Sequence, residues 1–285
     1  MKNSCILDRQ PTIVDWEQVW QQAYRRRKTD RNDREFWNKR APSFAEHVKE
    51  SPYVTDFLKI MAPEPHWSVL DVGCGAGTLA LPLAAMVTRV TAIDFSEVMI
   101  DILVDRCRKE VITNVSLHIL GWQDDWDAAG IEKHDVVIAS RSLVVEDLRA
   151  AITKLASKAR HRVIISSLVG DGPFDRKIFE AIGRPLDRGP DYICVYNLLY
   201  QMGIFADVAF VGNQVNEKVF PELNKVYSDI EEAVQGYRWM IDDMTIEEEA
   251  RLRIFLEKHL VKRDGGYSLS YHHPVRWAII SWNKQ

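Results

Sequence analysis

The segment DVGCGAG at residues 71–77 joins an apolar run to an amphipathic one and carries a glycine at every second position after Val72. Glycines in such a turn let the backbone approach a ligand closely, and the helix that follows presents free amide groups. Asp71 opens the segment, and Asp94 ends the next apolar run, where a carboxylate can accept hydrogen bonds from ribose hydroxyl groups. These residues predict a site for a ligand that contains a ribose.

The glycine spacing separates two kinds of ribose ligand. Gly73, Gly75 and Gly77 form a G-x-G-x-G pattern. A nicotinamide dinucleotide site has G-x-G-x-x-G, which would put the third glycine at position 78, where the sequence has Thr78. A carboxylate at Asp71, in front of the turn, favours a cationic group on the ligand over a pyrophosphate. The pattern therefore favours a ribose with a positively charged tail and speaks against a nicotinamide oxidoreductase.

Short apolar runs alternate with amphipathic stretches from residue 67 onward, and each run is short enough to be a buried strand. The runs are 68–73, 89–95, 115–120, 134–140 and 162–168. Repeated β–α units predict an α/β fold with a doubly wound, mostly parallel sheet and helices on both faces. Ser96 is a good N-cap for the helix after the second run, which would place that helix terminus beside Asp94.

Helical patterns flank this region. We expect residues 1–60 to form an N-terminal helical arm or lid, residues 61–215 the core, and residues 216–285 a helical cap insertion and the closing strand or hairpin. The stretch 24–40 carries eight basic and three acidic side chains. This is typical of a solvated helical face, and the alternative is a site for an anion or an acidic substrate.

Composition narrows the class of protein further. The chain has 285 residues and a formal net charge of −4 at pH 7, which gives no global electrostatic case for binding nucleic acid or an anionic membrane. No apolar run approaches the roughly 18 residues that span a bilayer. The cysteines at positions 5, 74, 107 and 194 form no C-x-x-C pair. We therefore expect reduced thiols in a cytoplasmic protein, and no metal site.

Three segments together resemble the motif series of class I S-adenosylmethionine-dependent methyltransferases. They are VLDVGCGAGTLALPLA (69–84), VTAIDFSEVMI (90–100) and HDVVIASRSLV (134–144). The resemblance implies a Rossmann-like, seven-stranded sheet whose last strand is antiparallel, with the runs 207–215 and 276–284 as the two further strands. It also implies S-adenosyl-L-methionine as the cofactor and S-adenosyl-L-homocysteine as the product.

The resemblance also implies the cofactor contacts. Asp94 would hold both ribose hydroxyls, Phe95 and Met99 would lie against the adenine, and Ser140 would lie beside the transferred methyl. Met99 would be a core residue on its spacing alone. The full implied set is Asp71, Gly73, Cys74, Gly75, Asp94, Phe95, Met99, Gly121, Trp122, Gln123 and Ser140.

The sequence departs from the family after the third strand. Many members have Gly-Asp there to meet the adenine amino group, whereas this chain has Gly121-Trp122. Backbone amides near Trp122, or the side chains of Gln123 and Asp124, would have to replace that aspartate. Trp122 and Trp126 could also simply cover the edge of the sheet.

The acceptor site is less marked, and its candidates are Ser140, Arg141, Tyr196, Tyr200 and His272. Arg141 suits a carboxylate or phosphate on the substrate, or else forms a salt bridge with Glu146 or Asp147. Tyr196 and Tyr200 belong to an aromatic stripe at helical spacing that either packs or lines a pocket. Inserted helices with Tyr237, Trp239 and Met240 would close over that pocket, and His272 is either a base or a structural residue.

The function predicted from these residues is S-adenosylmethionine-dependent transfer of a methyl group to a small-molecule acceptor by in-line SN2 displacement. Two alternatives remain at this point: an RNA or protein methyltransferase that uses the basic arm, and an S-adenosylmethionine-binding protein without turnover. A small-molecule substrate is the expected partner, with no membrane partner and no nucleic acid.

Overall fold

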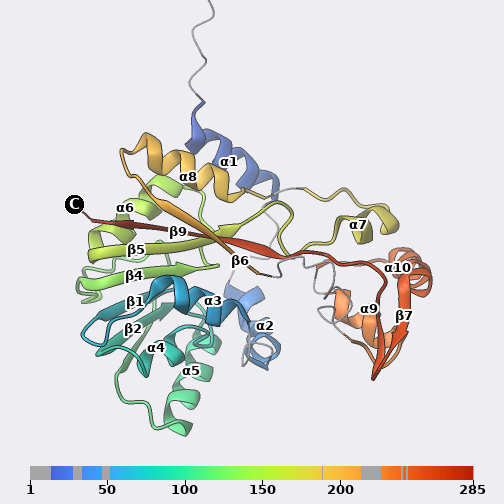
Figure 1. Cartoon of the computed structure of the whole chain (residues 1–285), viewed down its shortest axis with the longest axis horizontal. Helices are drawn as coiled ribbons and strands as arrows, with labels where there is room; N and C mark the ends of the chain where they lie inside the picture. The colour runs from blue at the N-terminus through green and yellow to red at the C-terminus, as the bar shows by residue number, and fades with distance from the viewer. Residues whose placement is uncertain are drawn as a thin grey trace, which may run out of the picture.

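The computed structural model describes residues 14–27, 34–46, 52–187, 189–212, 226–238, 240–241 and 243–284. A seven-stranded sheet with the order β3-β2-β1-β4-β5-β9-β6 forms its centre (Figure 1). The strands are β1 (Ser68–Val72), β2 (Arg89–Asp94), β3 (Val115–Ile119), β4 (His134–Ser140), β5 (Ala159–Leu168), β6 (Asp207–Gly212) and β9 (Arg276–Asn283). Strand β9 is antiparallel to both of its neighbours, β5 and β6, while β1 to β5 pair in parallel. The predicted doubly wound sheet with an antiparallel last strand is confirmed.

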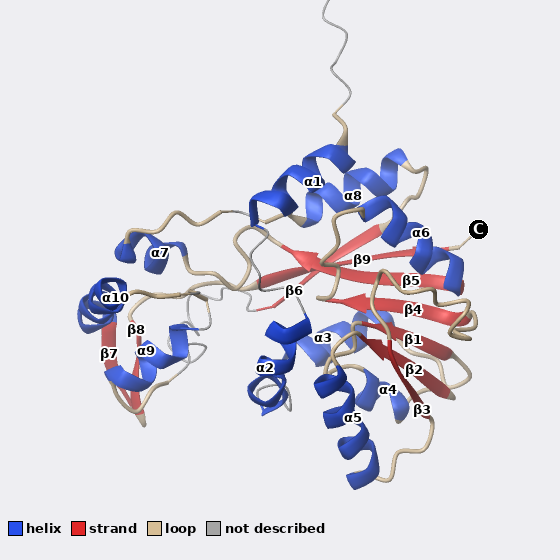
Figure 2. Cartoon of the chain, turned by 180° about the vertical axis from the view of Figure 1, so that it is seen from behind, coloured by secondary structure: helices blue, strands red, loops and turns tan. Residues whose placement is uncertain are grey.

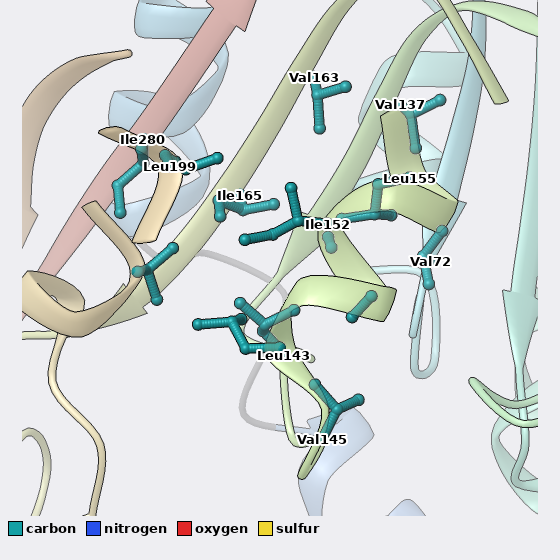
Figure 3. Packing of buried hydrophobic residues seen from close by; sticks show 14 of the residues in the cluster. Val72, Val137, Leu143, Val145, Ile152, Leu155, Val163, Ile165, Leu199 and Ile280 are labelled. Atoms are coloured by element: carbon teal, nitrogen blue, oxygen red, sulfur yellow. The ribbon is translucent and has the colours of Figure 1, made fainter. Parts of the chain in front are cut away.

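Side chains of the central strands alternate between two apolar layers because successive residues of a strand point to opposite faces. Leu70, Val137 and Val163 face one layer, beneath α1 (Trp16–Arg27), α6 (Leu148–Lys158) and α8 (Tyr192–Gln201). Figure 3 shows Val137 and Val163 in this layer, together with Ile152 and Leu155 of α6. Val69 and Val136 face the other, beneath α3 (Pro52–Met61), α4 (Ala80–Ala84) and α5 (Glu97–Lys109). Burial on both faces of the sheet therefore explains why apolar residues stand at consecutive positions in these runs.

The N-terminal helices dock at separate places. Trp20 of α1 donates its indole N–H to the carbonyl of Val145 at 2.7 Å, and Glu17 accepts from the first amides of α6. Helix α2 (Arg34–Glu46) lies against α5, where Asn38 accepts a 2.6 Å hydrogen bond from Ser96 (Figure 2). The predicted arm is thus divided between the two sides of the sheet, and residues 28–33 of its basic stretch lie outside the described residues.

A third apolar cluster stands beyond the carboxyl ends of the parallel strands (Figures 1 and 2). It joins α7 (Arg176–Ile182), α9 (Ile230–Arg238), α10 (Ile246–His259) and the hairpin of β7 (Leu260–Arg263) and β8 (Gly266–Leu269). Helix α7 comes from between β5 and α8, inside the range 61–215 expected to form the core, whereas the other elements come from between β6 and β9. The segment 267–269 pairs with β7 and not with the closing strand β9.

No helix in the described ranges is long and apolar enough to cross a membrane. Cys74, Cys107 and Cys194 are buried free thiols, and Cys5 lies outside the described residues.

Candidate active site

The glycine turn after β1 is tied to β2 and to the segment after β4. The amides of Gly73 and Cys74 both donate to the carbonyl of Ile93, at 2.8 and 3.1 Å. Gly73 has φ +69°, and a Cβ atom there would lie 2.3 Å from the Cβ of Ser142. The Ser142 hydroxyl in turn donates to the carbonyl of Val72 at 2.5 Å. Glycine is required at 73 both by the backbone conformation and by this close approach.

Asp94 ends β2 and holds the turn from the other side. Its carboxylate is 6% exposed and accepts hydrogen bonds from the amides of Gly75, at 2.8 Å, and Ser96, at 2.9 Å. A carboxylate can accept about four hydrogen bonds, so acceptor capacity remains for hydroxyl groups of a ligand. Ser96 caps α5 as predicted, with its hydroxyl accepting from the amide of Met99.

Asp71 lies deeper, at the end of β1, and is 1% exposed. Its Oδ2 atom is buried and has no hydrogen-bond partner. Burial, and then the neighbouring Asp94 carboxylate, raise the pKa of Asp71 to about 7. A buried acceptor without a partner is destabilising, and a cation at this position would both pair with the oxygen and favour the ionised carboxyl.

The turn after β3 forms another part of the candidate cofactor site. The Asp124 carboxylate accepts from the amide of Gly121 at 2.6 Å, so it holds the turn itself. A Cβ at Gly121 would lie 3.2 Å from the Cβ of Phe95, which brings these two predicted residues together. Trp122 donates its indole N–H to the carbonyl of Ser142 at 3.0 Å and thereby links this turn to the end of β4. Gln123 is exposed, and its contact with adenine stays a prediction.

Other members of the predicted cofactor set are packed in apolar surroundings. Met99 is 2% exposed and clusters with Ala41 and Ala45 of α2 and with Ala76. Cys74 is buried in the layer beneath α3, α4 and α5. These positions match the core alternative for Met99, and adenine contact by Met99 remains a prediction. Trp126, at 1% exposed, is part of the opposite layer, and its indole N–H donates to the carbonyl of Gly121.

A hydroxyl network covers the ends of β4 and β5. The Tyr53 hydroxyl donates to the hydroxyl oxygen of Ser166 at 2.9 Å and lies 2.7 Å from that of Ser140. A phenol has one proton, so the Ser140 hydroxyl is the donor to Tyr53. The backbone amide of Arg141 also donates to Ser166, at 2.8 Å. The predicted pair Ser140 and Arg141 is therefore fixed at the sheet edge by a tyrosine from α3.

Of the two predicted tyrosines of α8, Tyr200 lies at the other end of the sheet, and a role for Tyr196 stays a prediction. Tyr196 is 36% exposed and Tyr200 is 65% exposed. Tyr200 contacts Phe205, with ring centroids 5.8 Å apart, just before the amino end of β6. Since β6 runs parallel to β5, this is the end of the sheet away from the glycine turn. The stripe was expected either to pack or to line a pocket, and in the structure Tyr200 stands at the surface.

His272 lies in the segment before β9, at the edge where β5 ends. Burial, and then the neighbouring His273, lower the pKa of His272. His273 contacts the carbonyl of Gly172 through a ring nitrogen at 3.0 Å. A role for His272 as a base stays a prediction. In the third cluster Tyr237 and Met240 are buried, while Trp239 lies outside the described residues.

Sequence reasoning missed three residues of this region: Tyr53, Ser166 and Trp277. Tyr53 stands at helical spacing with buried Phe57 and Met61, a pattern that indicates packing and gives no sign of where its hydroxyl points. Ser166 and Ser167 are adjacent polar residues that follow the apolar run 163–165, and this was the signal that could have found Ser166. Trp277 is the second residue of β9, and its ring centroid lies 6.2 Å from that of Tyr53.

Comparison with known proteins agrees with this geometry. A family model described as a methyltransferase domain matches residues 69–161. An uncharacterized protein of Haemophilus influenzae is 34% identical over 249 residues, which are 87% of this chain and 88% of that protein. The magnesium-protoporphyrin O-methyltransferase of Rhodobacter capsulatus is 30% identical over 101 residues, 34% of this chain and 43% of that enzyme. The solved structure of a proposed methyltransferase from Bacillus halodurans has a similar fold, with a TM-score of 0.52, 13% identity, and coverage of 81% of this chain and 98% of that one.

The chain belongs to the class I S-adenosylmethionine-dependent methyltransferases. This methyltransferase has residues that fit its cofactor. The orphaned Oδ2 of Asp71 suits the ammonium group of the methionine moiety, and the remaining acceptor capacity of Asp94 suits the two ribose hydroxyls. Both carboxylates flank the same glycine turn, so one ligand can meet both.

Proposed function

We propose that this methyltransferase moves a methyl group to a small-molecule acceptor by in-line displacement. The observation that carries the proposal is a hydrogen bond between two strand ends. Ser142 directly follows the acceptor candidates Ser140 and Arg141, and its hydroxyl donates to the carbonyl of Val72 beside the glycine turn. Residues for the cofactor and residues for an acceptor therefore converge on neighbouring strand ends, which is where ligands bind in doubly wound sheets. The small-molecule substrate named for the Rhodobacter capsulatus relative supports the same class of acceptor.

When bound, S-adenosylmethionine supplies a methyl group already activated by its sulfonium. The chain's task is then to bind, orient and exclude water. Asp71 and Asp94 would hold the two ends of the cofactor, and Gly73 allows the backbone to approach it. Ser140, whose proton is directed to Tyr53, keeps its oxygen available as a hydrogen-bond acceptor beside the reacting groups. A general base is needed only for an acceptor that is protonated at the working pH.

The alternative of an RNA or protein substrate on the basic arm has less support. Arg25 of α1 pairs with Glu146 at 2.6 Å, and the arm's Trp20 is used to anchor α1 to the core. Through these contacts, side chains of α1 hold the helix against the core. The net charge of −4 also disfavours a nucleic-acid partner.

The first experiment is calorimetric titration of the full chain with S-adenosylmethionine, S-adenosylhomocysteine and NAD. Binding of the first two compounds but not of NAD supports S-adenosylmethionine as the cofactor, and binding of NAD alone contradicts it. Labelled S-adenosylmethionine is then incubated with the low-molecular-mass, protein and RNA fractions of cells. Label transferred to the first fraction supports the proposal. Label in protein or RNA with none in small molecules contradicts it, and cofactor binding without any transfer favours a protein without turnover.

A further inference from the structure

Arg141 has an unusual backbone for a residue that is not glycine. Its φ is +57°, in the left-handed region, immediately after β4 ends at Ser140. Such conformations are uncommon outside glycine, asparagine and aspartate, and they gather at binding and catalytic sites. Here the amide of Arg141 is held by the hydroxyl oxygen of Ser166 at 2.8 Å. The turn directs the side chain across the end of the sheet, toward α3 and β9.

The guanidinium of Arg141 contacts two aromatic rings there. Its central carbon lies 4.4 Å from the centroid of the Tyr53 ring and 5.7 Å from that of Trp277. The two rings also contact each other edge to face. A guanidinium that stacks on rings is fixed in orientation, and its planar edge of N–H donors stays available.

The carboxylates that could have neutralised Arg141 are engaged elsewhere. Glu146 pairs with Arg25 at 2.6 Å, and Asp147 caps α6 by accepting from the amide of Ala150. Among the described parts of the chain, no ion pair and no side-chain hydrogen bond includes the Arg141 guanidinium. Burial lowers the pKa of this group. A partly buried cation without an anion is an incomplete ion pair.

We infer that Arg141 binds a carboxylate on the methyl acceptor, with the rest of the acceptor lying beside the half-buried ring of Trp277. This inference rests on the proposed function, because it places the acceptor beside Ser140 at the cofactor turn. A carboxylate matches the bidentate edge of one guanidinium in shape and charge. A phosphate dianion carries a second charge and would need more donors than one guanidinium supplies.

The test measures binding of benzoate to the full chain saturated with S-adenosylhomocysteine, by saturation-transfer NMR. Benzamide is the neutral analogue and phenyl phosphate the competing anion. The variants are Arg141→Asn, because asparagine tolerates the left-handed backbone, and Arg141→Lys, which keeps the charge but loses the planar edge. Arg108→Gln is the matched control, since Arg108 is an exposed residue of α5 paired with Asp105.

We expect benzoate to bind the wild type and Arg108→Gln equally, at least tenfold more weakly to Arg141→Asn, and severalfold more weakly to Arg141→Lys. S-adenosylhomocysteine should bind all four within twofold, which shows that the variants are folded. Benzoate binding that is unchanged in Arg141→Asn, equalled by benzamide, or absent from the wild type overturns the inference while the cofactor result stands. Phenyl phosphate that binds tenfold more tightly than benzoate overturns the choice of carboxylate. Failure of the wild type to bind S-adenosylhomocysteine would instead remove the proposed function itself.

Discussion

Asp71 and Asp94 are buried carboxylates on the two sides of one glycine turn, and they differ in the hydrogen bonds that they accept within the protein. Asp94 accepts two backbone hydrogen bonds, whereas Asp71 has a buried oxygen without a partner. The negative charge of Asp94 adds to the effect of burial and raises the pKa of Asp71 to about 7. Asp71 is therefore poised to lose a proton when a cation binds beside it.

Cofactor affinity should depend on pH through Asp71. The folded pKa lies above the ordinary value, so ionisation of Asp71 opposes folding, and this contribution weakens the unliganded protein as pH rises from about 4 to about 7. A bound ammonium reverses the preference and favours the carboxylate. For a pKa near 7, we expect S-adenosylhomocysteine to bind about tenfold more tightly at pH 8 than at pH 6.

Asp71→Asn is the control for that pH dependence, because the ligand's own amino group titrates identically with both proteins. Calorimetry in buffers of different ionisation enthalpy should show proton release on binding to the wild type near pH 6 and less for the variant. Equal pH profiles for the two proteins would mean that Asp71 does not meet the ammonium group.

Asp94 should contribute both to the ribose contact and to the turn. Asp94→Ala removes the acceptor for the amides of Gly75 and Ser96, so it should weaken cofactor binding by a few kcal/mol and also lower Tm. The ribose contact is isolated by comparing S-adenosylhomocysteine with its 2′-deoxy analogue. The wild type should lose about tenfold in affinity on removal of that hydroxyl, and Asp94→Ala should lose little. Equal losses would place the ribose elsewhere.

The sheet and the cofactor edge could be predicted because their signals are local. Residues 68–73 and 89–95 are continuous apolar runs that end in a glycine turn or an aspartate, and the structure shows β1 and β2 there. The acceptor edge could not be predicted in the same way. Tyr53 and Ser166 are 113 positions apart and meet only because α3 folds across the strand ends.

Spacing also gave no means of telling which of several aromatic groups would face the site. Tyr200 belongs to a periodic stripe and is exposed, whereas Tyr53 belongs to another and is 6% exposed. The difference arises from the side of the helix that meets the sheet, which depends on neighbouring elements. For the same reason α7 packs with distant α10 in the third cluster, although a strand and a helix of the core follow it in sequence.

Gly73 should be far less tolerant of alanine than Gly130, which has a similar backbone. Both have positive φ, +69° and +76°, but a Cβ at Gly130 would meet nothing within 4 Å. We expect Gly130→Ala to cost about 1 kcal/mol from backbone strain alone. Gly73→Ala adds a collision with Ser142 and should cost about 3 kcal/mol, measured by urea denaturation with an unchanged m value. Adding Ser142→Gly should recover part of the loss, and no recovery would mean that the collision is relieved in another way.

Helix α2 should slow release of the cofactor, because Asn38 anchors it to the cap of α5 beside Asp94. Ser96 donates to Asn38 at 2.6 Å, and Asn38 donates to Glu97 at 3.3 Å. Loss of this anchor in Asn38→Ala should speed dissociation of S-adenosylhomocysteine about fivefold, the effect of about 1 kcal/mol, as measured by stopped-flow displacement. Glu35→Ala is the control, since Glu35 forms an exposed pair with Lys39 on the same helix. If both variants release the product at the wild-type rate, α2 is a fixed part of the fold and not a lid.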